Sequence, residues 1–381
     1  MKIRETIPFN IPYHTGKETI YIADCIKRGK TCGNGEYTNR CQNYFARTLG
    51  SLKCMMTTSC TDSLEMAAML AGISSGDEVI VPSYTFVSTA LAFARQGATI
   101  VFADSRTDNP DIDAEKIESL ITPRTRAIVP VHYAGIACDM DRIMEIAERH
   151  GLLVIEDAAQ GIDSSYKGRP LGSIGHMACF SFHETKNIQC GEGGLLAINH
   201  PDYVKRAEIL WEKGTNRQEF FRGEVNKYGW VDLGSSFLPA DYVCAFLWAQ
   251  LEELESIQGK RKKLWEHYDS RLRGIKGLQC PEIPGYATNN AHAYFVICDT
   301  PDRRTRLIER LKRDGIHAVF HYLSLHKSEF ARKSGWDTAV LPEADKYTDC
   351  LLRLPMFHDL THEDVDRVCD TIINFYNACQ S

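Results

Sequence analysis

The stretch that decides the fold is Phe180-Ser181-Phe182-His183-Glu184-Thr185-Lys186-Asn187, which leads into Gly191-Glu192-Gly193-Gly194. An apolar, strand-like run ends here in polar residues, and Lys186 lies between that run and a glycine-rich turn. Glycine lets a backbone fold closely around a ligand. A lysine that is partly removed from water has a lowered pKa and can form a Schiff base. Most lysines are exposed, so Lys186 supports this interpretation only together with other segments.

The next informative segment lies upstream and reads Val154-Ile155-Glu156-Asp157-Ala158-Ala159-Gln160-Gly161. An apolar strand ends here in two carboxylates, and ligand sites in open α/β sheets lie at the carboxyl ends of strands. A carboxylate at that place can pair with a cationic ring nitrogen, as the pyridinium of pyridoxal phosphate requires. Taken alone, Asp157 is better explained as the cap of a loop or as part of a structural pair. One strand–loop–strand step separates it from Lys186, so both side chains could face one site.

A third segment, Thr57-Thr58-Ser59-Cys60-Thr61-Asp62-Ser63-Leu64-Glu65, leads small hydroxyl residues into an apolar helix that stops at Gly72. Asp62 and Glu65 fit a capping box, and Ser59 or Thr61 could equally serve as the cap. The free amides and the dipole of a helix N-terminus favour anions. Taken alone, the pattern is better explained by an ordinary N-cap.

Apolar runs that alternate with helical patterns predict a mostly parallel α/β sheet covered on both faces. A long helix over residues 241–272 then leads into a smaller α+β unit, which gives two domains, residues 1–255 and 256–381. The predicted strands of the large domain are residues 78–82, 99–103, 127–131, 152–156, 178–182 and 195–198, with helices at 64–70, 114–121 and 140–150. Those of the small domain are 293–298 and 318–322, with helices at 303–314 and 361–379.

Composition limits the class of protein. The 381 residues are 44% hydrophobic and 25% charged, with a net charge of −6, which is ordinary for a globular protein and does not imply a broad nucleic-acid-binding surface. No segment has the pattern of a signal peptide or a bilayer span. The 14 cysteines show no CxxC spacing, so we expect free thiols and a cytoplasmic location.

Other patterns are weaker. The glycines at 191–194 lack the GxGxxG or Walker spacing of nucleotide-binding loops. His321, Tyr322 and His326 lack the spacing of a metal site, so a substrate-loop role is expected for the first two and a packed structural role for His326. The basic run at residues 260–263 is expected to be a solvated helix face.

Taken together, these segments resemble the DegT/DnrJ/EryC1/StrS family of sugar-nucleotide aminotransferases. The resemblance extends over nearly the whole chain. It includes Pro8-Phe9-Asn10, Gly76-Asp77-Glu78-Val79-Ile80, Pro82-Ser83-Tyr84-Thr85-Phe86-Val87-Ser88-Thr89, Pro130-Val131-His132-Tyr133-Ala134-Gly135, Glu212-Lys213-Gly214-Thr215-Asn216-Arg217 and His321-Tyr322. It implies the fold type I architecture of pyridoxal-phosphate enzymes, with a large mixed sheet and a smaller C-terminal domain, in a homodimer with sites at the subunit interface.

The resemblance also implies the roles of individual residues. Lys186 would carry the cofactor and move the proton, Asp157 would pair with the pyridine nitrogen, and Gln160 would bond the ring hydroxyl. The further residues that it implies are Phe86 stacked on the cofactor ring, Ser59, Thr61, Asp62 and Ser181 around the phosphate, and His183, Asn187, Arg217, His321 and Tyr322 around the substrate. The chain departs from the family at Gly234-Ser235-Ser236, where Ser236 stands in place of an asparagine that reaches the neighbouring subunit's phosphate.

The expected reaction transfers the amino group of L-glutamate to a dTDP-linked keto-6-deoxysugar, in the first instance dTDP-4-keto-6-deoxyglucose at C4. A C3-keto isomer is the alternative acceptor. Some relatives are sugar dehydratases with histidine at the position of the lysine, and Lys186 argues against that reaction. A non-catalytic sensor of cofactor or sugar is a further alternative, against which the intact lysine, aspartate and aromatic set argues.

Overall fold

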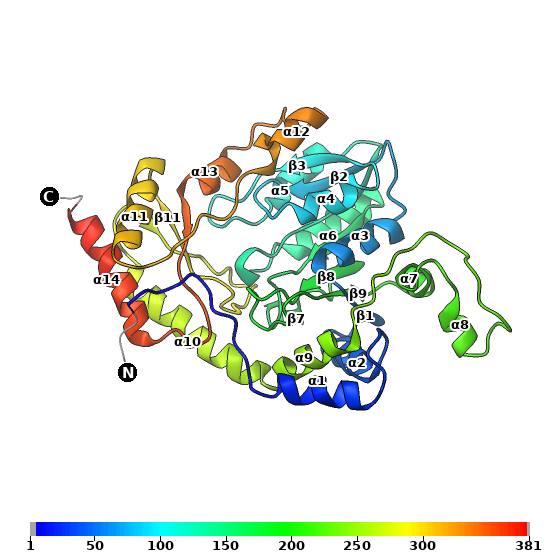
Figure 1. Cartoon of the computed structure of the whole chain (residues 1–381). Helices are drawn as coiled ribbons and strands as arrows, with labels where there is room; N and C mark the ends of the chain where they lie inside the picture. Colours follow the sequence, from blue (N-terminus) through cyan, green and yellow to red (C-terminus); the bar gives the residue numbers. More distant parts are fainter. Residues whose placement is uncertain (1–4, 379–381) are drawn as a thin grey trace.

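The computed structural model describes residues 5–378, and a seven-stranded mixed sheet forms their centre (Figure 1). Its spatial order is β1-β9-β8-β5-β4-β2-β3. The strands from β8 to β3 run parallel, whereas β9 is antiparallel to both of its neighbours. The strands are β1 (Lys53–Thr57), β2 (Glu78–Pro82), β3 (Thr99–Ala103), β4 (Thr125–Ile128), β5 (Leu153–Asp157), β8 (Met177–Ser181) and β9 (Gly194–Ile198).

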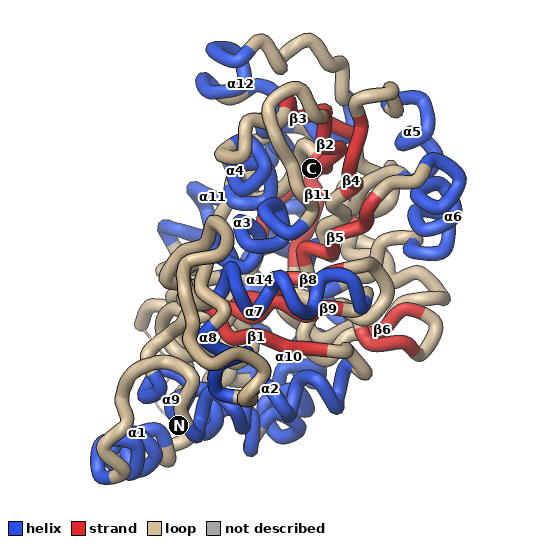
Figure 2. Tube along the Cα trace, turned by 90° about the vertical axis from the view of Figure 1, so that its right-hand side faces the viewer, coloured by secondary structure: helices blue, strands red, loops and turns tan. Residues whose placement is uncertain are grey.

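Helices cover both faces of this sheet (Figure 2). One face packs against α3 (Cys60–Leu70), α4 (Ser88–Ala94) and α7 (Val204–Trp211), and the other against α5 (Ala114–Ile117) and α6 (Met140–His150). Because successive strand residues point to opposite faces, Val154 and Ile155 of β5 contribute to the two different layers, and both are fully buried. This confirms that the continuous apolar runs are strands covered on both sides.

A smaller sheet lies beside the large one (Figure 1) and is wholly antiparallel. It consists of β10 (Leu278–Gln279), β11 (Phe295–Cys298) and β12 (Leu351–Arg353) and packs against α10 (Leu254–Leu272), α11 (Pro301–Arg313), α13 (Pro342–Cys350) and α14 (His362–Ala378). The N-terminal segment also contacts this unit, because Ile7 forms a bridge with Ile316. A domain boundary at residue 255 remains a proposal.

Two predicted elements differ most from the structure, and the expectation of a solvated run at 260–263 is wrong at Arg261, which is buried. The helix predicted over 241–272 is two helices, α9 (Asp241–Glu252) and α10, with a break at Glu253. The sequence shows no break because tertiary packing causes it: α9 packs on α1 (Glu18–Lys27) and α10 on α14. The strand predicted over 318–322 is wrong. Only Val319 forms a bridge there, and the His321 carbonyl accepts hydrogen bonds from the hydroxyls of Tyr84 and Tyr133 instead of a strand partner.

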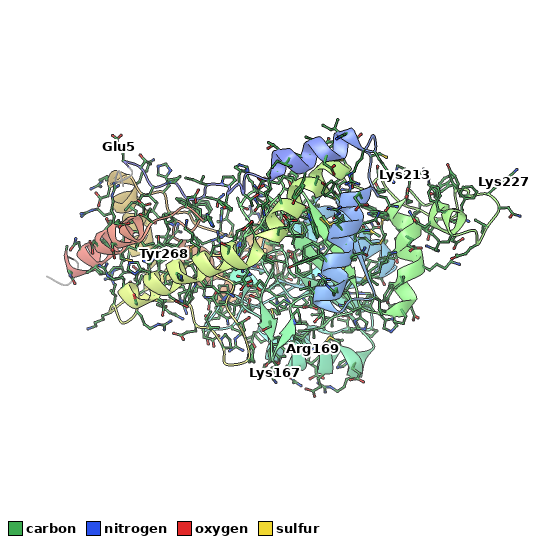
Figure 3. All side chains as sticks on the ribbon, turned by 90° about the horizontal axis from the view of Figure 1, so that it is seen from below. Glu5, Lys167, Arg169, Lys213, Lys227 and Tyr268 are labelled. Atoms are coloured by element: carbon green, nitrogen blue, oxygen red, sulfur yellow. The ribbon has the colours of Figure 1, made fainter. Side chains whose placement is uncertain are left out.

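Helix α2 (Glu36–Leu49) packs with α9 against β1, β8 and β9. The remaining elements are α8 (Arg217–Phe221), α12 (Glu329–Ser334), and the hairpin of β6 (Ser165–Tyr166) and β7 (Arg169–Pro170). The segment of residues 212–237, which carries α8, extends away from the body; Figure 3 shows Lys213 and Lys227 at the end opposite Tyr268 of α10. None of the helices in residues 5–378 is long and apolar enough to cross a membrane.

A fully buried carboxylate, Glu156, fixes the loop beneath the end of β5. Its two oxygens accept hydrogen bonds from the amides of Gly172, Ile174 and Gly175 at 2.6 to 2.8 Å and from His132 Nε2 at 3.0 Å. Burial alone would raise the pKa of this carboxyl, but the His132 ring and the backbone amides outweigh that effect and lower it. The side chain therefore acts as a charged anchor rather than as a proton carrier.

Replacing Glu156 by alanine should strongly destabilise the protein, because it leaves three buried amides and a buried histidine without an acceptor. Each buried donor that is left without a partner costs about 1–3 kcal/mol in the free energy of unfolding. We expect a clearly lower urea midpoint, whereas Glu148→Ala, on the exposed side of α6, should change the free energy by less than about 0.5 kcal/mol. Equal midpoints for the two variants would contradict the anchor role.

Candidate active site

A cavity of about 410 Å³ opens at the carboxyl ends of the parallel strands, where the small unit faces the large one. Asp157 ends β5 and Ser181 ends β8, and both contribute to the wall. Ligand sites in open α/β sheets lie at this edge. Ten of the residues predicted for the site line the cavity: Ser59, Thr61, Phe86, Asp157, Gln160, Ser181, His183, Lys186, His321 and Tyr322.

One wall of the cavity is the N-terminus of α3. Ser59 is the cap of this helix, and its Oγ accepts a hydrogen bond from the Asp62 amide at 3.0 Å. The Thr61 hydroxyl is 2.8 Å from the hydroxyl of Ser88. At Gly194 a Cβ atom would lie 2.3 Å from the Ser59 carbonyl group, so glycine is needed for β9 to pass this close to the helix. A helix N-terminus with hydroxyl groups beside it suits a phosphate.

Asp157 supplies a carboxylate at the bottom of the cavity. One of its oxygens accepts a hydrogen bond from the Thr89 hydroxyl at 2.7 Å, and the other from the Ala159 amide at 3.1 Å. Burial raises the pKa of Asp157, and these hydrogen bonds and the charge of Lys186 act against the rise without cancelling it. A cation placed against this carboxylate would therefore gain a strong partner and would keep it ionised.

Lys186 lies in the turn after β8, and its side chain is partly buried in the same cavity. The pKa of its amine falls from 10.5 to about 8, mainly because burial disfavours the charged form; the positive charge of Arg353 adds to the fall, and Asp157 opposes it. At pH 8 about half of this amine is neutral, compared with roughly 0.4% of an ordinary lysine. Lys186 is therefore a usable nucleophile and proton carrier near neutral pH.

This pKa gives a testable pH dependence. Only the neutral amine attacks an aldehyde, so the rate at which the cofactor-free protein captures pyridoxal phosphate should rise with pH, with its midpoint near 8 and not near 10. Stopped-flow absorbance between pH 6 and pH 10 would measure this rate. A rate that keeps rising up to the pKa of an exposed lysine would contradict the burial argument.

Gln160 and two aromatic residues form the side of the cavity toward the small unit. The Gln160 oxygen accepts a hydrogen bond from the Ala134 amide at 2.7 Å, and its nitrogen donates to the Tyr322 hydroxyl at 3.3 Å. The rings of Phe86 and Tyr322 have centroids 5.9 Å apart, and Phe86 is 55% exposed at the mouth. The fixed amide and the two aromatic faces suit a flat, polar ring.

Four residues predicted for the site lie outside the cavity lining. Asn187 is buried, with its amide bonded to Gln258, His292 and the Asn290 carbonyl. The Asp62 carboxylate accepts hydrogen bonds from the hydroxyls of Thr58 and Ser59. Only the backbone of Asp62 therefore remains to contribute at the start of the helix. Arg217 and Ser236 are exposed on the 212–237 segment.

Several lining residues were not singled out from the sequence. Arg353 and His292 come from the small unit, Phe9 from the N-terminal segment and Cys60 from the first turn of α3. Thr89 supports Asp157 from α4. Phe9, Cys60 and Thr89 lie in segments quoted above, without a role given there. Arg353 carried a signal of its own, because it interrupts the apolar run Leu351-Leu352-Arg353-Leu354.

The donors in this cavity fit pyridoxal phosphate. When bound, the cofactor supplies an aldehyde for amines and a ring that accepts electrons from a neighbouring carbon. Lys186 would hold it covalently and move a proton at Nζ, while Asp157 would hold a proton on the ring nitrogen. The start of α3 with Ser59, Thr61 and Ser181 would hold the phosphate, and Gln160 would fix the ring hydroxyl. A mixed sheet of this type with such a cavity defines a pyridoxal-phosphate-dependent enzyme of fold type I.

Comparison with known proteins identifies the family. The sequence pattern of the DegT/DnrJ/EryC1/StrS aminotransferase family matches residues 13–373, and the chain belongs to this family. It is 32% identical over 375 residues to the spore coat polysaccharide biosynthesis protein SpsC of Bacillus subtilis, and the match covers 96% of both chains.

Solved structures of sugar aminotransferases are similar to this chain over nearly its whole length. The putative sugar aminotransferase Spr1654 from Streptococcus pneumoniae, in its PMP form, has a TM-score of 0.92 at 26% identity and covers 98% of both chains. DesV of S. venezuelae, in complex with a ketimine intermediate, has a TM-score of 0.90 at 31% identity and covers 97% of this chain and 98% of its own. The protein is therefore a sugar aminotransferase that uses pyridoxal phosphate.

Proposed function

We propose that the enzyme moves the amino group of L-glutamate to C4 of dTDP-4-keto-6-deoxyglucose. The observation that carries the proposal is that the Lys186 amine and the Asp157 carboxylate line one cavity. A lysine at this position supports transamination over the dehydratase alternative. The sequence resembles dTDP-4-amino-4,6-dideoxygalactose transaminase, which supports the choice of sugar. The name of the Bacillus subtilis relative supports a place in polysaccharide synthesis. A role in making the O-antigen of lipopolysaccharide remains a prediction.

A homodimer with shared active sites is part of this proposal. The 212–237 segment extends from the body and exposes large apolar side chains, among them Trp230 at 80% and Leu233 at 69%. Exposed apolar groups gathered on one segment are typical of a protein interface. Arg217 and Ser236 lie on this segment, and in a dimer they would reach the substrate and the phosphate of the other subunit's cavity. A cytoplasmic location remains a prediction.

The sugar assignment is tested with purified, cofactor-loaded protein. It is incubated with L-glutamate and either dTDP-4-keto-6-deoxyglucose or its 3-keto isomer, and the product is read by NMR. We expect an amino group at C4 from the 4-keto sugar and no turnover of the isomer. Amination at C3 would replace the proposed acceptor with its rival, and loss of the 4-keto sugar without a gain of nitrogen would favour a dehydratase.

A further inference from the structure

Two threonine hydroxyls form a chain that ends on Asp157. Thr85 lies in the loop after β2 and Thr89 in the first turn of α4, and their Oγ1 atoms are 3.0 Å apart. The Oγ1 atom of Thr89 lies 2.7 Å from Asp157 Oδ2. Both threonines are buried, and Thr85 also lines the cavity. The chain therefore runs from the cavity wall to the carboxylate at the bottom of the same cavity.

The direction of each hydrogen bond in this chain follows from the number of protons. An ionised carboxylate only accepts, so Thr89 donates its single hydroxyl proton to Asp157. From Thr85 the Thr89 oxygen can then only accept, which commits the Thr85 proton to Thr89. A proton on Asp157 Oδ2 would force the whole chain to reverse. The arrangement therefore favours the charged form of the carboxylate.

Asp157 needs this support because it is buried. Burial raises its pKa, and among the groups that oppose the rise the Thr89 hydroxyl has the largest effect. The Ala159 amide and the charges of Lys186 and His132 follow. Hydrogen bonds to a charged group are stronger than those between neutral groups. Without the Thr89 hydroxyl, the carboxylate would therefore hold a proton more tightly.

The same turn of α4 is also tied to the wall where the phosphate is expected. The hydroxyl of Ser88 lies 2.8 Å from that of Thr61 at the start of α3. Ser88 and Thr89 are consecutive, so one helical turn fixes the spacing between the phosphate wall and the Asp157 carboxylate. Threonine is branched at Cβ and has few side-chain rotamers, which keeps its hydroxyl aimed at Asp157.

The position of one proton decides how well the bound cofactor works. Asp157 and the ring nitrogen share this proton, and the ring accepts electrons well only when the nitrogen holds it. A carboxylate that already accepts a hydrogen bond from Thr89 is the weaker base and leaves the proton on the nitrogen. We propose that Thr89, oriented by Thr85, is a positioning residue that keeps the shared proton on the cofactor ring.

This inference rests on the assignment of Asp157 to the ring nitrogen and not on the identity of the sugar. The test loads the enzyme with pyridoxal phosphate that carries ¹⁵N in its ring. NMR near neutral pH then reads the ring nitrogen, whose chemical shift reports whether it holds a proton, and this readout needs no substrate. The rate of a single turnover with L-glutamate is measured on the same samples.

The variants separate the hydroxyl from the shape of the side chain. Thr89→Val removes the hydroxyl and keeps the branched shape, whereas Thr89→Ser keeps the hydroxyl. Thr85→Val weakens the chain without touching Asp157, and it keeps the test open if Thr89→Val does not fold. Thr371→Val is the matched control, because this buried threonine of α14 donates to the Asp314 carboxylate at 3.3 Å, outside the cavity lining.

In Thr89→Val the signal of the ring nitrogen should move from that of a protonated toward that of an unprotonated pyridine. The rate should fall about tenfold, as expected for the loss of a hydrogen bond to a charged group. Thr85→Val should shift the signal in the same direction by less. Thr89→Ser and Thr371→Val should keep the wild-type signal and rate.

A protonated ring signal in fully loaded Thr89→Val would overturn the proposal, even if that variant were less stable or bound the cofactor less tightly. An equal shift in Thr371→Val would do the same. Asp157→Asn distinguishes this failure from a failure of the site assignment. If its ring nitrogen stays protonated, the assignment of Asp157 itself is wrong. If Asp157→Asn loses the ring proton and Thr89→Val does not, only the role of Thr89 is wrong.

Discussion

Lys186→Ala should abolish transamination, with a loss of about 10⁴-fold or more in turnover. The variant loses both the amine that holds the cofactor and the base that moves the proton, and a positioned acid–base group alone contributes up to about 10⁴-fold. The burial that lowers the pKa of Lys186 to about 8 prepares this amine for both tasks. Other lysines, such as Lys333 of α12, pair with a carboxylate on the surface and lie outside the cavity lining.

The measurement combines turnover with covalent trapping. Borohydride reduction of the loaded wild-type protein, followed by peptide mapping, should place the cofactor on Lys186. Lys186→Ala should show no trapped cofactor, and Lys333→Ala, at a surface lysine of α12, should behave as wild type. A cofactor trapped on a different lysine, or substantial turnover by the alanine variant, would remove the basis of the site assignment. Turnover that survives without trapping would favour a non-catalytic role for this lysine.

Local patterns predicted the parts of the molecule that depend on local physics. The buried strands β2 and β3 match their predicted bounds, and helix α6 begins and ends as predicted, because Asp139 caps it and Gly151 ends it. The pattern of strands also predicted that Asp157 and Lys186 share one site, because the ends of neighbouring parallel strands meet at one edge of the sheet. Three residues were candidates for the cap of α3, and only the structure shows that Ser59 is the cap.

What could not be predicted depends on contacts between distant segments. The break at Glu253 and the absence of a strand at 318–322 result from tertiary partners that the sequence does not display. Asn187 follows Lys186 directly, yet its side chain is directed to His292 and Gln258 of the other unit. Arg353 is far along the chain from every other cavity group, so only the fold shows that it belongs to the site.

Asp157→Asn should lower turnover by about 10²–10³-fold, the usual cost of removing one preorganised electrostatic contact from an active site. The ring nitrogen of the cofactor stays protonated only next to an anion, and the ring accepts electrons well only when it is protonated. Asparagine keeps the shape and can still accept from the Thr89 hydroxyl, but it carries no charge. The effect should therefore fall on the chemical step and not on cofactor binding.

The design that separates these effects measures cofactor content and rate together. Because the phosphate contacts at the start of α3 are untouched, cofactor-derived absorbance per subunit should remain near the wild-type value in Asp157→Asn. Asp163→Asn is the matched control: Asp163 lies in the loop that follows β5, pairs with Lys262 at 3.0 Å on the surface, and should leave the rate unchanged. A rate loss that disappears when excess cofactor is added would mean that Asp157 acts in binding. A loss that persists at full occupancy, with Asp163→Asn unaffected, is the result expected if this buried carboxylate keeps the ring nitrogen protonated.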